Sequence, residues 1–429
     1  MNVAIAGAGI SGLAAAISLR RSGHRVTIYE RSSLNNEIGA AINVPPNVGR
    51  FLLPWGLDPA KYGFVTSNGM YFISPTTLEE RIFHDHTDTA ELFGQPLYYA
   101  HRVDLHESLK HLATEPDGIG IPVRVHLKSG VSSFNPDAPS LTLHDGTLIA
   151  ADLVVAADGV NSIATEAILG NVNPPVVAKD VNCCYRFLIP RADLEIDPET
   201  VWVNQGHQRL GCRVFSDLER QRRLIAYSCR NYEVYNFVAL CYNDDITSKK
   251  EDWHASVDKT EVLEKYAGFH PKVLAVINKA TEVKRWPLLY RPPIRTWHKD
   301  RMVLVGDAVH PMLPNHAQGG AQGIEDGLAL GLVMHGVTDA SHIEEHLVIY
   351  EKIRRNRAST IQILSNFGFE EVVSDELLEF LDGRPMPKNV NEMIQLAYGE
   401  DVLQRTIKHM TEFDPSWKLP DGFFPARKE

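Results

Sequence analysis

Residues 2–12 read NVAIAGAGISG, an apolar run of strand length that leads directly into closely spaced glycines. Residues 13–19, LAAAISL, strongly favour a helix, and Gly23 ends it. The stretch therefore predicts a strand, a tight turn and a helix, which is the opening unit of a Rossmann-like fold.

The residues of this turn have separate expected tasks in binding a dinucleotide. Gly7 allows the tight turn, Gly9 lets the backbone approach a pyrophosphate, and Gly12 lets helix and strand pack closely. Ser11 stands in the first turn of the helix, where free N–H groups and the positive end of the helix dipole favour phosphate. A glycine turn that binds nothing is the alternative.

The second predicted strand favours the ligand interpretation. It reads RVTIY at residues 25–29, and Glu30 and Arg31 follow it. A carboxylate about 20 residues beyond the glycines suits the hydroxyl pair of a ribose. We therefore assign Glu30 and its neighbour Arg31 to the same site.

Two later segments distinguish FAD from NAD. Asp158-Gly159 follows one apolar run, and Gly306-Asp307 follows another at residues 301–305. Ligands of such sheets lie at the carboxyl ends of the strands, where Asp307 can accept hydrogen bonds from ribitol hydroxyls. Together with the glycine turn, these segments predict one FAD bound along its whole length. The alternative for Asp307 is a loop cap.

A loop that contains Pro314 leads from Asp307 to a second predicted helix. Gly319 and Gly320 stand just before its helix-forming stretch, residues 321–335. The N-terminus of this helix would direct positive charge at the flavin N1 and C2 carbonyl region, which favours anionic reduced flavin.

Together these segments resemble the single-component FAD-dependent aromatic hydroxylases, which have the p-hydroxybenzoate hydroxylase fold. Within that group the chain is most similar to the salicylate hydroxylase-like branch of fungal secondary metabolism. The resemblance spans residues 1 to about 365. Further matching segments are Gly39 to Ile42, Pro46-Asn47, His101 to Leu105, Ala317 to Gly319, Glu325-Asp326-Gly327 and Tyr350 to Arg357.

The resemblance implies roles and a reaction. Arg102 would contact the FAD diphosphate or ribitol, Ala41 the adenosine side, and Gly319 and Gly320 the isoalloxazine. NAD(P)H is the transient co-substrate, and reduced flavin with O2 gives a C4a-hydroperoxide that hydroxylates or dearomatises a phenolic or related aromatic substrate. The alternatives are another FAD redox enzyme (oxidase, epoxidase or reductase) and a degenerate FAD-binding protein.

One position departs from the family pattern. In the family, the aspartate-glycine segment continues to a serine and then, three residues later, to an arginine that supports the FAD and pyridine nucleotide region. In this chain Ser162 is followed by Thr165 at that position. If the arginine matters, Thr165→Arg should speed flavin reduction by NAD(P)H.

Electrophilic oxygen transfer needs an electron-rich ring, and holding a phenol of pKa ~10 as phenolate at pH 7 costs about 4 kcal/mol. The resemblance places Arg186 and Tyr227 where they would hold that phenolate. His316 is a candidate base beside the flavin, and Pro314 would contribute its carbonyl. The alternatives are a surface arginine, a core tyrosine and a loop histidine bonded to backbone. His310 is interpreted as structural support for the loop.

The predicted fold class is α/β, with a Rossmann-like FAD-binding domain, an interleaved antiparallel sheet domain for the substrate and a helical C-terminal region. We expect the FAD-binding domain to use residues 1–70, 97–178 and 285–340, the sheet domain 71–96 and 181–284, and the helical region 341–429. Apolar residues at helical spacing in residues 350–365 predict packing against the first domain.

Composition excludes several classes of function. A net charge of −11 disfavours nucleic-acid and anionic membrane partners, and no apolar run reaches the ~20 residues of a transmembrane helix. The five cysteines lack C-x-x-C spacing and indicate reduced thiols in a cytoplasmic protein. We predict no metal site, because His84-Asp85-His86 is interpreted as a solvated loop. No feature specifies an oligomeric state.

Overall fold

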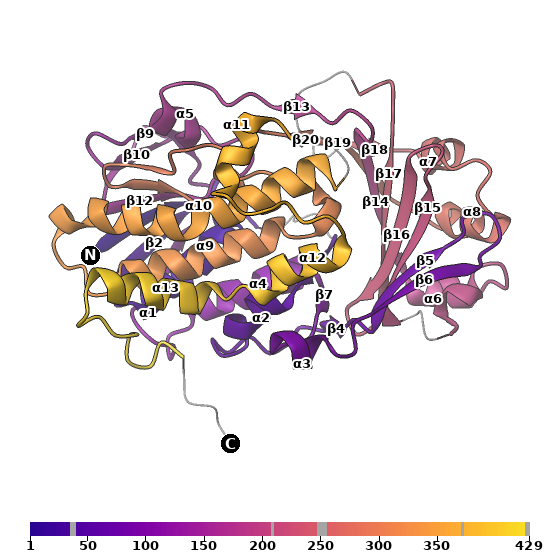
Figure 1. Cartoon of the computed structure of the whole chain (residues 1–429), viewed down its shortest axis with the longest axis horizontal. Helices are drawn as coiled ribbons and strands as arrows, with labels where there is room; N and C mark the ends of the chain where they lie inside the picture. The colour runs from indigo at the N-terminus through magenta and orange to yellow at the C-terminus, as the bar shows by residue number, and fades with distance from the viewer. Residues whose placement is uncertain (35–39, 207–209, 247–254, 370–372, 425–429) are drawn as a thin grey trace.

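The computed structural model describes residues 1–34, 40–206, 210–246, 255–369 and 373–424. It has two lobes side by side along its long axis (Figure 1). One lobe is a mostly parallel sheet covered by helices, and the other is a large, mainly antiparallel sheet with short helices on its outer face. The α/β class predicted from the sequence is confirmed.

The predicted strand, turn and helix lie at the centre of the first lobe. Within the described residues, this sheet has six strands in the order β21-β22-β12-β1-β2-β8, and all neighbours except β21 and β22 pair in parallel. The strands are β1 (Asn2–Ala6), β2 (Arg25–Tyr29), β8 (Arg124–His126), β12 (Leu153–Ala156), β21 (His298–Lys299) and β22 (Met302–Leu304). The central position of β1 follows from its sequence, because Val3 to Ala6 are all buried and apolar.

Helices pack tightly over this sheet because of small residues. A Cβ at Gly327 would lie 2.4 Å from the backbone N of Ala15, and one at Gly331 would lie 2.1 Å from Ser18 Oγ. These glycines let the helix that carries them approach the first helix closely, and that helix is buried from Ala321 onward. The helices of this lobe include α1 (Ile10–Arg21), α2 (Pro46–Leu52), α4 (Arg102–Thr114), α5 (Ala164–Leu169), α9 (Gly319–Val333), α10 (Ile343–Phe367) and α13 (Val402–Phe413).

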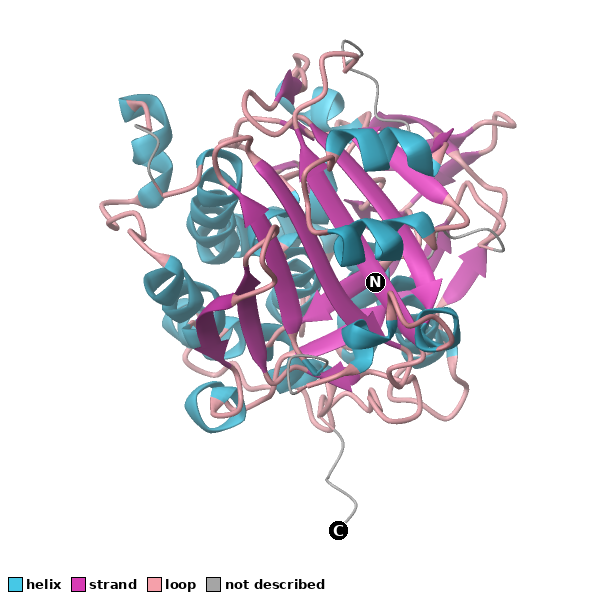
Figure 2. Cartoon of the chain, turned by 90° about the vertical axis from the view of Figure 1, so that its right-hand side faces the viewer, coloured by secondary structure: helices cyan, strands magenta, loops and turns pink. Residues whose placement is uncertain are grey.

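The second lobe is one broad sheet (Figure 2). In the described chain its order is β18-β19-β14-β17-β16-β15-β5-β6, with only β15 and β5 parallel. The strands are β5 (Gly69–Ile73), β6 (Glu80–Asp85), β14 (Cys183–Pro190), β15 (Cys212–Asp217), β16 (Arg222–Cys229), β17 (Val234–Cys241), β18 (Ser256–Val257) and β19 (Val283–Pro287). Its outer face packs on α6 (Arg191–Glu195), α7 (Lys259–Lys265) and α8 (Pro271–Asn278), so its other face is left for the first lobe.

Smaller elements complete the described chain. A small sheet in the order β3-β7-β4 carries residues that bear on the site. Its strands are β3 (Ala41–Val44), β4 (Val65–Thr66) and β7 (Tyr98–His101). The remaining elements include β9 (Val131–Asn135), β10 (Ser140–Leu143), β11 (Leu148–Ala150), β13 (Val176–Val177), β20 (Leu289–Tyr290), α3 (Thr89–Phe93), α11 (Asp375–Leu378) and α12 (Val390–Ile394).

Some sequence expectations differ from the structure. The second predicted helix begins at Gly319 instead of residue 321. The solvated-loop interpretation is wrong for His86, which is buried and whose Nδ1 lies 2.9 Å from Ser67 Oγ. His84 and Asp85 belong to β6, because this polar stretch pairs with β5 at the edge of the sheet. Across the described ranges, no helix is long and apolar enough to span a bilayer.

Candidate functional site

The glycines of the turn after β1 fall into two groups, those needed for packing within the protein and one that faces open space. A Cβ at Gly7 would lie 2.4 Å from the carbonyl O of Ala157, and one at Gly12 would lie 2.1 Å from the carbonyl O of Gly7. Both positions therefore need glycine for packing within the protein. Gly9 has no heavy atom within 4 Å of where its Cβ would stand, so the space in front of it is open to a ligand.

The first helix packs closely against the turn that carries Asp307. Ser11 Oγ would be 2.2 Å from a Cβ at Gly306 and 2.0 Å from one at Gly323. The small Ser11 side chain thus fills the space between two glycines, one in the turn after β22 and one in α9. This packing brings the first and third predicted segments together.

Glu30 is buried at the edge of the glycine turn. Its Oε2 accepts a hydrogen bond from the Ala8 N–H at 2.8 Å, and its Oε1 accepts one from Ser32 N–H at 2.8 Å. Each oxygen keeps a lone pair for a further donor. Arg31 is exposed beside it.

Asp307 lies in the turn that follows β22. Its side chain is exposed to solvent, yet burial among protein atoms raises its pKa, while the charges of His310 and Arg102 oppose that rise. A carboxylate on the outer surface would not be desolvated in this way, so the two observations together place Asp307 in a recess. Arg102 stands at the start of α4, where its N–H donates to Ala40 O at 2.8 Å.

Asp158 offers an unused acceptor. Its Oδ1 is buried and has no partner in the described chain, whereas Oδ2 accepts from the Ile163 N–H at 3.2 Å. Burial raises its pKa. Gly159 beside it has a φ of +84° and open space where a Cβ would stand.

Among the described residues, no side chain caps the start of α9. Its N-cap residue Gln318 makes no side-chain capping bond, and the first turn contains no acidic residue. A Cβ at Gly320 would lie 2.9 Å from Ile42 Cδ1, so glycine is needed for contact with β3. A Cβ at Gly319 would lie 3.7 Å from Met312 Cγ, an ordinary contact distance. The helix end is therefore open on its Gly319 side.

These groups fit FAD. Buried or recessed carboxylates can accept bonds from ribose and ribitol hydroxyls, and two helix N-termini and a guanidinium suit a pyrophosphate and a flavin carbonyl. The carboxylates are those of Glu30, Asp158 and Asp307, and the guanidinium is that of Arg102. Gly39, from the matching segment before β3, lies outside the described residues.

A buried network of charges lies behind the site, and sequence reasoning did not assign it. Arg354 donates to Glu325 at 2.6 Å and to Asp326 at 2.8 Å, and Arg357 bonds Glu325 at 2.8 Å. His310 Nε2 lies 2.6 Å from Asp326 Oδ2. The available signal was a pair of adjacent acids inside an apolar helix, because such acids must be paired when buried.

Ala41 is held by two side chains of the large sheet. Its N–H donates to Asn236 Oδ1 at 3.1 Å, and its carbonyl accepts from Tyr227 OH at 3.2 Å. Tyr227 and Asn236 are direct neighbours on β16 and β17. This bond pair joins β3 of the first lobe to the second lobe, and Asn236, a polar residue in an apolar strand, was missed from the sequence.

Arg186 lies on the sheet face that packs against the loop around Pro314. Its Cζ is 5.0 Å from the ring centroid of Trp286, and Trp286 shares an apolar cluster with Leu313. Arg186 is half-buried, and its Nε is buried without a hydrogen-bond partner among the described residues. The guanidinium is thus held by stacking and keeps donor capacity.

Tyr227 is an electrostatic neighbour of Arg186. Burial raises the pKa of Tyr227, and the charge of Arg186 opposes this rise. Its ring lies 4.6 Å from that of Tyr99. Arg186 and Tyr227 lie on the same face of the sheet, on β14 and β16 with β17 between them, and the Tyr227 hydroxyl donates to Ala41.

The loop candidates lie in one short turn. Burial lowers the pKa of His316 to about 4, so the imidazole is neutral at pH 7. Its Nε2 is buried with no partner in the described chain, and its ring is 5.3 Å from that of Phe369. The Pro314 carbonyl accepts a bond from the Ala317 N–H at 3.1 Å.

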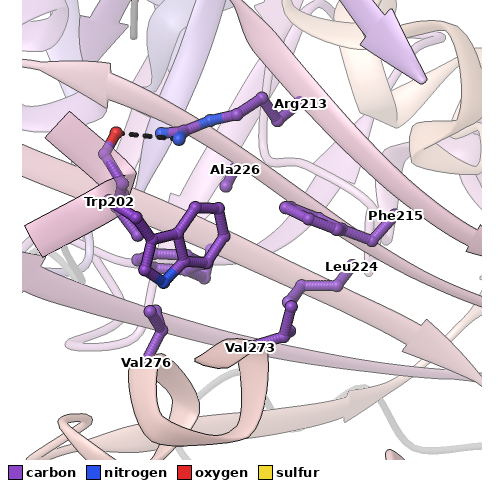
Figure 3. Close-up of a pocket in the computed structure, with 9 residues that line it drawn as sticks. Trp202, Arg213, Phe215, Leu224, Ala226, Val273 and Val276 are labelled. Atoms are coloured by element: carbon purple, nitrogen blue, oxygen red, sulfur yellow. Dashed lines mark hydrogen bonds between the residues drawn. The ribbon is translucent and has the colours of Figure 1, made fainter. Parts of the chain in front are cut away.

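A small cavity lies on the opposite face of the large sheet (Figure 3). It has a volume of about 10 Å³ and is lined by Trp202, Arg213 and Phe215 among others. Arg213 donates to the Val203 carbonyl at 2.8 Å there. A volume of this size holds at most a water molecule. Because the cavity lies on the outer face of the sheet, it is separate from the site.

Comparisons with known proteins agree with this geometry. Residues 123–363, more than half of the chain, match the family described as FAD binding domain, and residues 5–41 match the NAD(P)-binding Rossmann-like domain. The chain is 46% identical over 426 residues to the FAD-dependent monooxygenase cfoG of Aspergillus candidus, covering 99% of this chain and 98% of that protein. It is 33% identical to hispidin-3-hydroxylase of Neonothopanus nambi, covering 84% and 86%. The crystal structure of CtdE in complex with FAD and substrate 4 superposes with a TM-score of 0.78 at 21% identity, covering 96% and 98%.

Proposed function

We propose, because this chain belongs to the FAD-dependent monooxygenases, that it transfers one oxygen atom from O2 to a phenolic or related aromatic substrate, with NAD(P)H as the transient co-substrate. Hydroxylation and oxidative dearomatisation are both within this chemistry. The similarity to hispidin-3-hydroxylase, an enzyme named for hydroxylation of an aromatic compound, supports the substrate class.

The Arg186 guanidinium carries the proposal of an ionised phenol. It is fixed over Trp286 and faces the loop between Asp307 and α9, and its buried Nε has no partner among the described residues. A cation with free donor capacity stabilises a phenolate oxygen by a charge-assisted hydrogen bond. The apolar cluster of Trp286 and Leu313 next to it excludes water from the same region.

Neighbouring residues would bind the substrate together with Arg186. Bound FAD supplies the redox chemistry between NAD(P)H, O2 and the substrate. The Tyr227 hydroxyl makes a long 3.2 Å bond to Ala41 O, which it can exchange for a shorter bond to a charged oxygen. Neutral His316 would accept a hydrogen bond from a substrate hydroxyl, and the Pro314 carbonyl, which accepts from the Ala317 N–H, would keep a lone pair for a second donor.

We assign the cofactor contacts from the same geometry. Glu30 binds the ribose, the turn and helix α1 bind the pyrophosphate, Asp307 and Asp158 bind ribitol, and the start of α9 faces the isoalloxazine. The full set of proposed FAD residues is Gly7, Gly9, Ser11, Gly12, Glu30, Arg31, Ala41, Arg102, Asp158, Asp307, Gly319 and Gly320.

We also propose the division of the chain and its compartment. Residues 1–70, 97–178 and 285–340 form the FAD-binding domain, 71–96 and 181–284 the substrate sheet domain, and 341–429 the helical region. The separation of the six-stranded and eight-stranded sheets supports this division. The cysteine spacing supports a cytoplasmic protein, in which these thiols stay reduced.

A panel of phenols paired with their methyl ethers tests the function. Phenols should stimulate NAD(P)H oxidation and gain one oxygen by mass spectrometry, whereas the ethers, which cannot ionise, should do neither. Turnover without NAD(P)H would indicate an oxidase. Stimulation by ethers equal to that by phenols would contradict the phenolate proposal.

A further inference from the structure

The turn that carries Asp307 is held at both ends by side chains from other segments. The N–H of Gly306 donates to Asp326 Oδ2 at 2.8 Å, and the carbonyl of Ala308 accepts from Thr165 Oγ1 at 2.7 Å. Asp307 lies between these two bonds, in a three-residue helical turn. We propose that Thr165 and Asp326 are positioning residues that fix the Asp307 carboxylate in its recess before FAD binds.

The Asp326 carboxylate that binds Gly306 is itself held firmly in place. Asp326 is fully buried and also accepts from His310 Nε2 at 2.6 Å and Arg354 Nε at 2.8 Å. Burial alone would raise its pKa, but the charges of His310 and Arg354 lower the pKa to about 2. Asp326 therefore stays an ionised acceptor at neutral pH, and its bond to Gly306 is a strong one.

The Thr165 hydrogen bond connects the Asp307 turn to the segment that carries Asp158. Thr165 lies in the first turn of α5, where its N–H donates to Ser162 Oγ at 3.3 Å. Ile163, which follows Ser162, donates its N–H to Asp158 Oδ2 at 3.2 Å. The same short segment thus holds Asp158 and, through Thr165, the Asp307 turn, so the two recessed carboxylates are set relative to one another.

This bond gives a reason for the departure at position 165. A threonine hydroxyl is short enough to reach the Ala308 carbonyl directly from α5. An arginine at this position has no hydroxyl and would lose the bond. On this basis Thr165→Arg should weaken FAD retention, whatever its effect on reduction by NAD(P)H.

The energetic consequence concerns binding more than folding. The turn has few bonds of its own, chiefly those from the N–H groups of Val309 and His310 to the Gly306 carbonyl. Without the Thr165 bond, FAD would have to order a looser turn when it binds, which lowers affinity. Loss of this one neutral hydrogen bond should raise the dissociation constant of FAD about fivefold.

Fluorescence titration of the apoprotein with FAD tests the proposal. Thr165→Val should raise the dissociation constant about fivefold, and Thr165→Ser, which keeps the hydroxyl, should stay within about twofold of wild type. The matched control is Thr114→Val, because Thr114 Oγ1 also donates to a backbone carbonyl, that of Lys110 at 2.9 Å, but on α4. This control should lower thermal stability without changing FAD affinity.

A double-mutant cycle with Asp307→Ala separates positioning from a general structural role. If Thr165 acts through Asp307, Thr165→Val should cost nothing further in the Asp307→Ala background. Wild-type affinity in Thr165→Val, or equal losses in both backgrounds, would overturn the proposal. Because the assay contains no aromatic substrate, failure of the proposed substrate chemistry would leave this result untouched.

Discussion

Replacing Arg186 with alanine should uncouple NAD(P)H consumption from oxygen transfer. The variant loses the guanidinium that stacks on Trp286 and carries an unpaired buried donor. It leaves Glu30, Asp158 and Asp307 in place, so FAD binding should remain at the wild-type level. The unused oxidising equivalents should then leave as hydrogen peroxide.

The expected size of the effect follows from one lost charged hydrogen bond. Such a bond contributes about 1.5–3 kcal/mol, which corresponds to a rate of oxygen transfer about 10- to 150-fold lower. Arg186 is half-buried, so solvent screens part of its charge and the lower end of this range is expected, about tenfold. Arg186→Lys keeps the charge without the planar fork and should fall between alanine and wild type.

Product yield and peroxide yield per NAD(P)H are the two quantities to measure, with a phenol that stimulates the wild-type enzyme. Arg191→Ala is the matched control, because Arg191 is a 41% exposed arginine paired with Glu195 on the outer face of the sheet. It should retain wild-type coupling. Wild-type product yield in Arg186→Ala would refute the assignment of Arg186 to the reacting ring.

Three further predictions test other parts of the account. Gly12→Ala should fail to fold, since its Cβ would lie 2.1 Å from Gly7 O, whereas Gly9→Ala should melt as wild type by circular dichroism yet lose FAD. FAD affinity should fall as pH drops through the raised pKa of Asp307, because protonation removes the ionised acceptor; in titrations at several pH values Asp307→Asn should lack this fall. Glu325→Gln, which removes the charge that pairs with two buried arginines, should lower the free energy of unfolding in urea by about 3–5 kcal/mol.

The part of the fold that the sequence predicts best is local. The apolar run of β1, the glycine turn and the first helix are neighbours in sequence, so their pattern alone predicts strand, turn and helix. Asp307 could be placed because it follows a strand at the carboxyl edge of a parallel sheet.

The contacts that were missed join residues far apart in sequence. Tyr227 reaches Ala41 because of the register of distant strands. Thr165 reaches Ala308 because α5 approaches the turn after β22. The burial of His86 likewise depends on Ser67 lying across the edge of the small sheet. Such contacts follow from tertiary packing, which a local pattern of residue types does not determine.

Oxygen isotope labelling shows whether the oxygen added to the product comes from O2. The purified protein is supplied with FAD, NAD(P)H, a stimulating phenol and 18O2, and the product is analysed by mass spectrometry. A monooxygenase should give one 18O atom per product molecule, with none incorporated when the label is in water. Product oxygen that comes from water, or a product formed without oxygen gain, would contradict a monooxygenase.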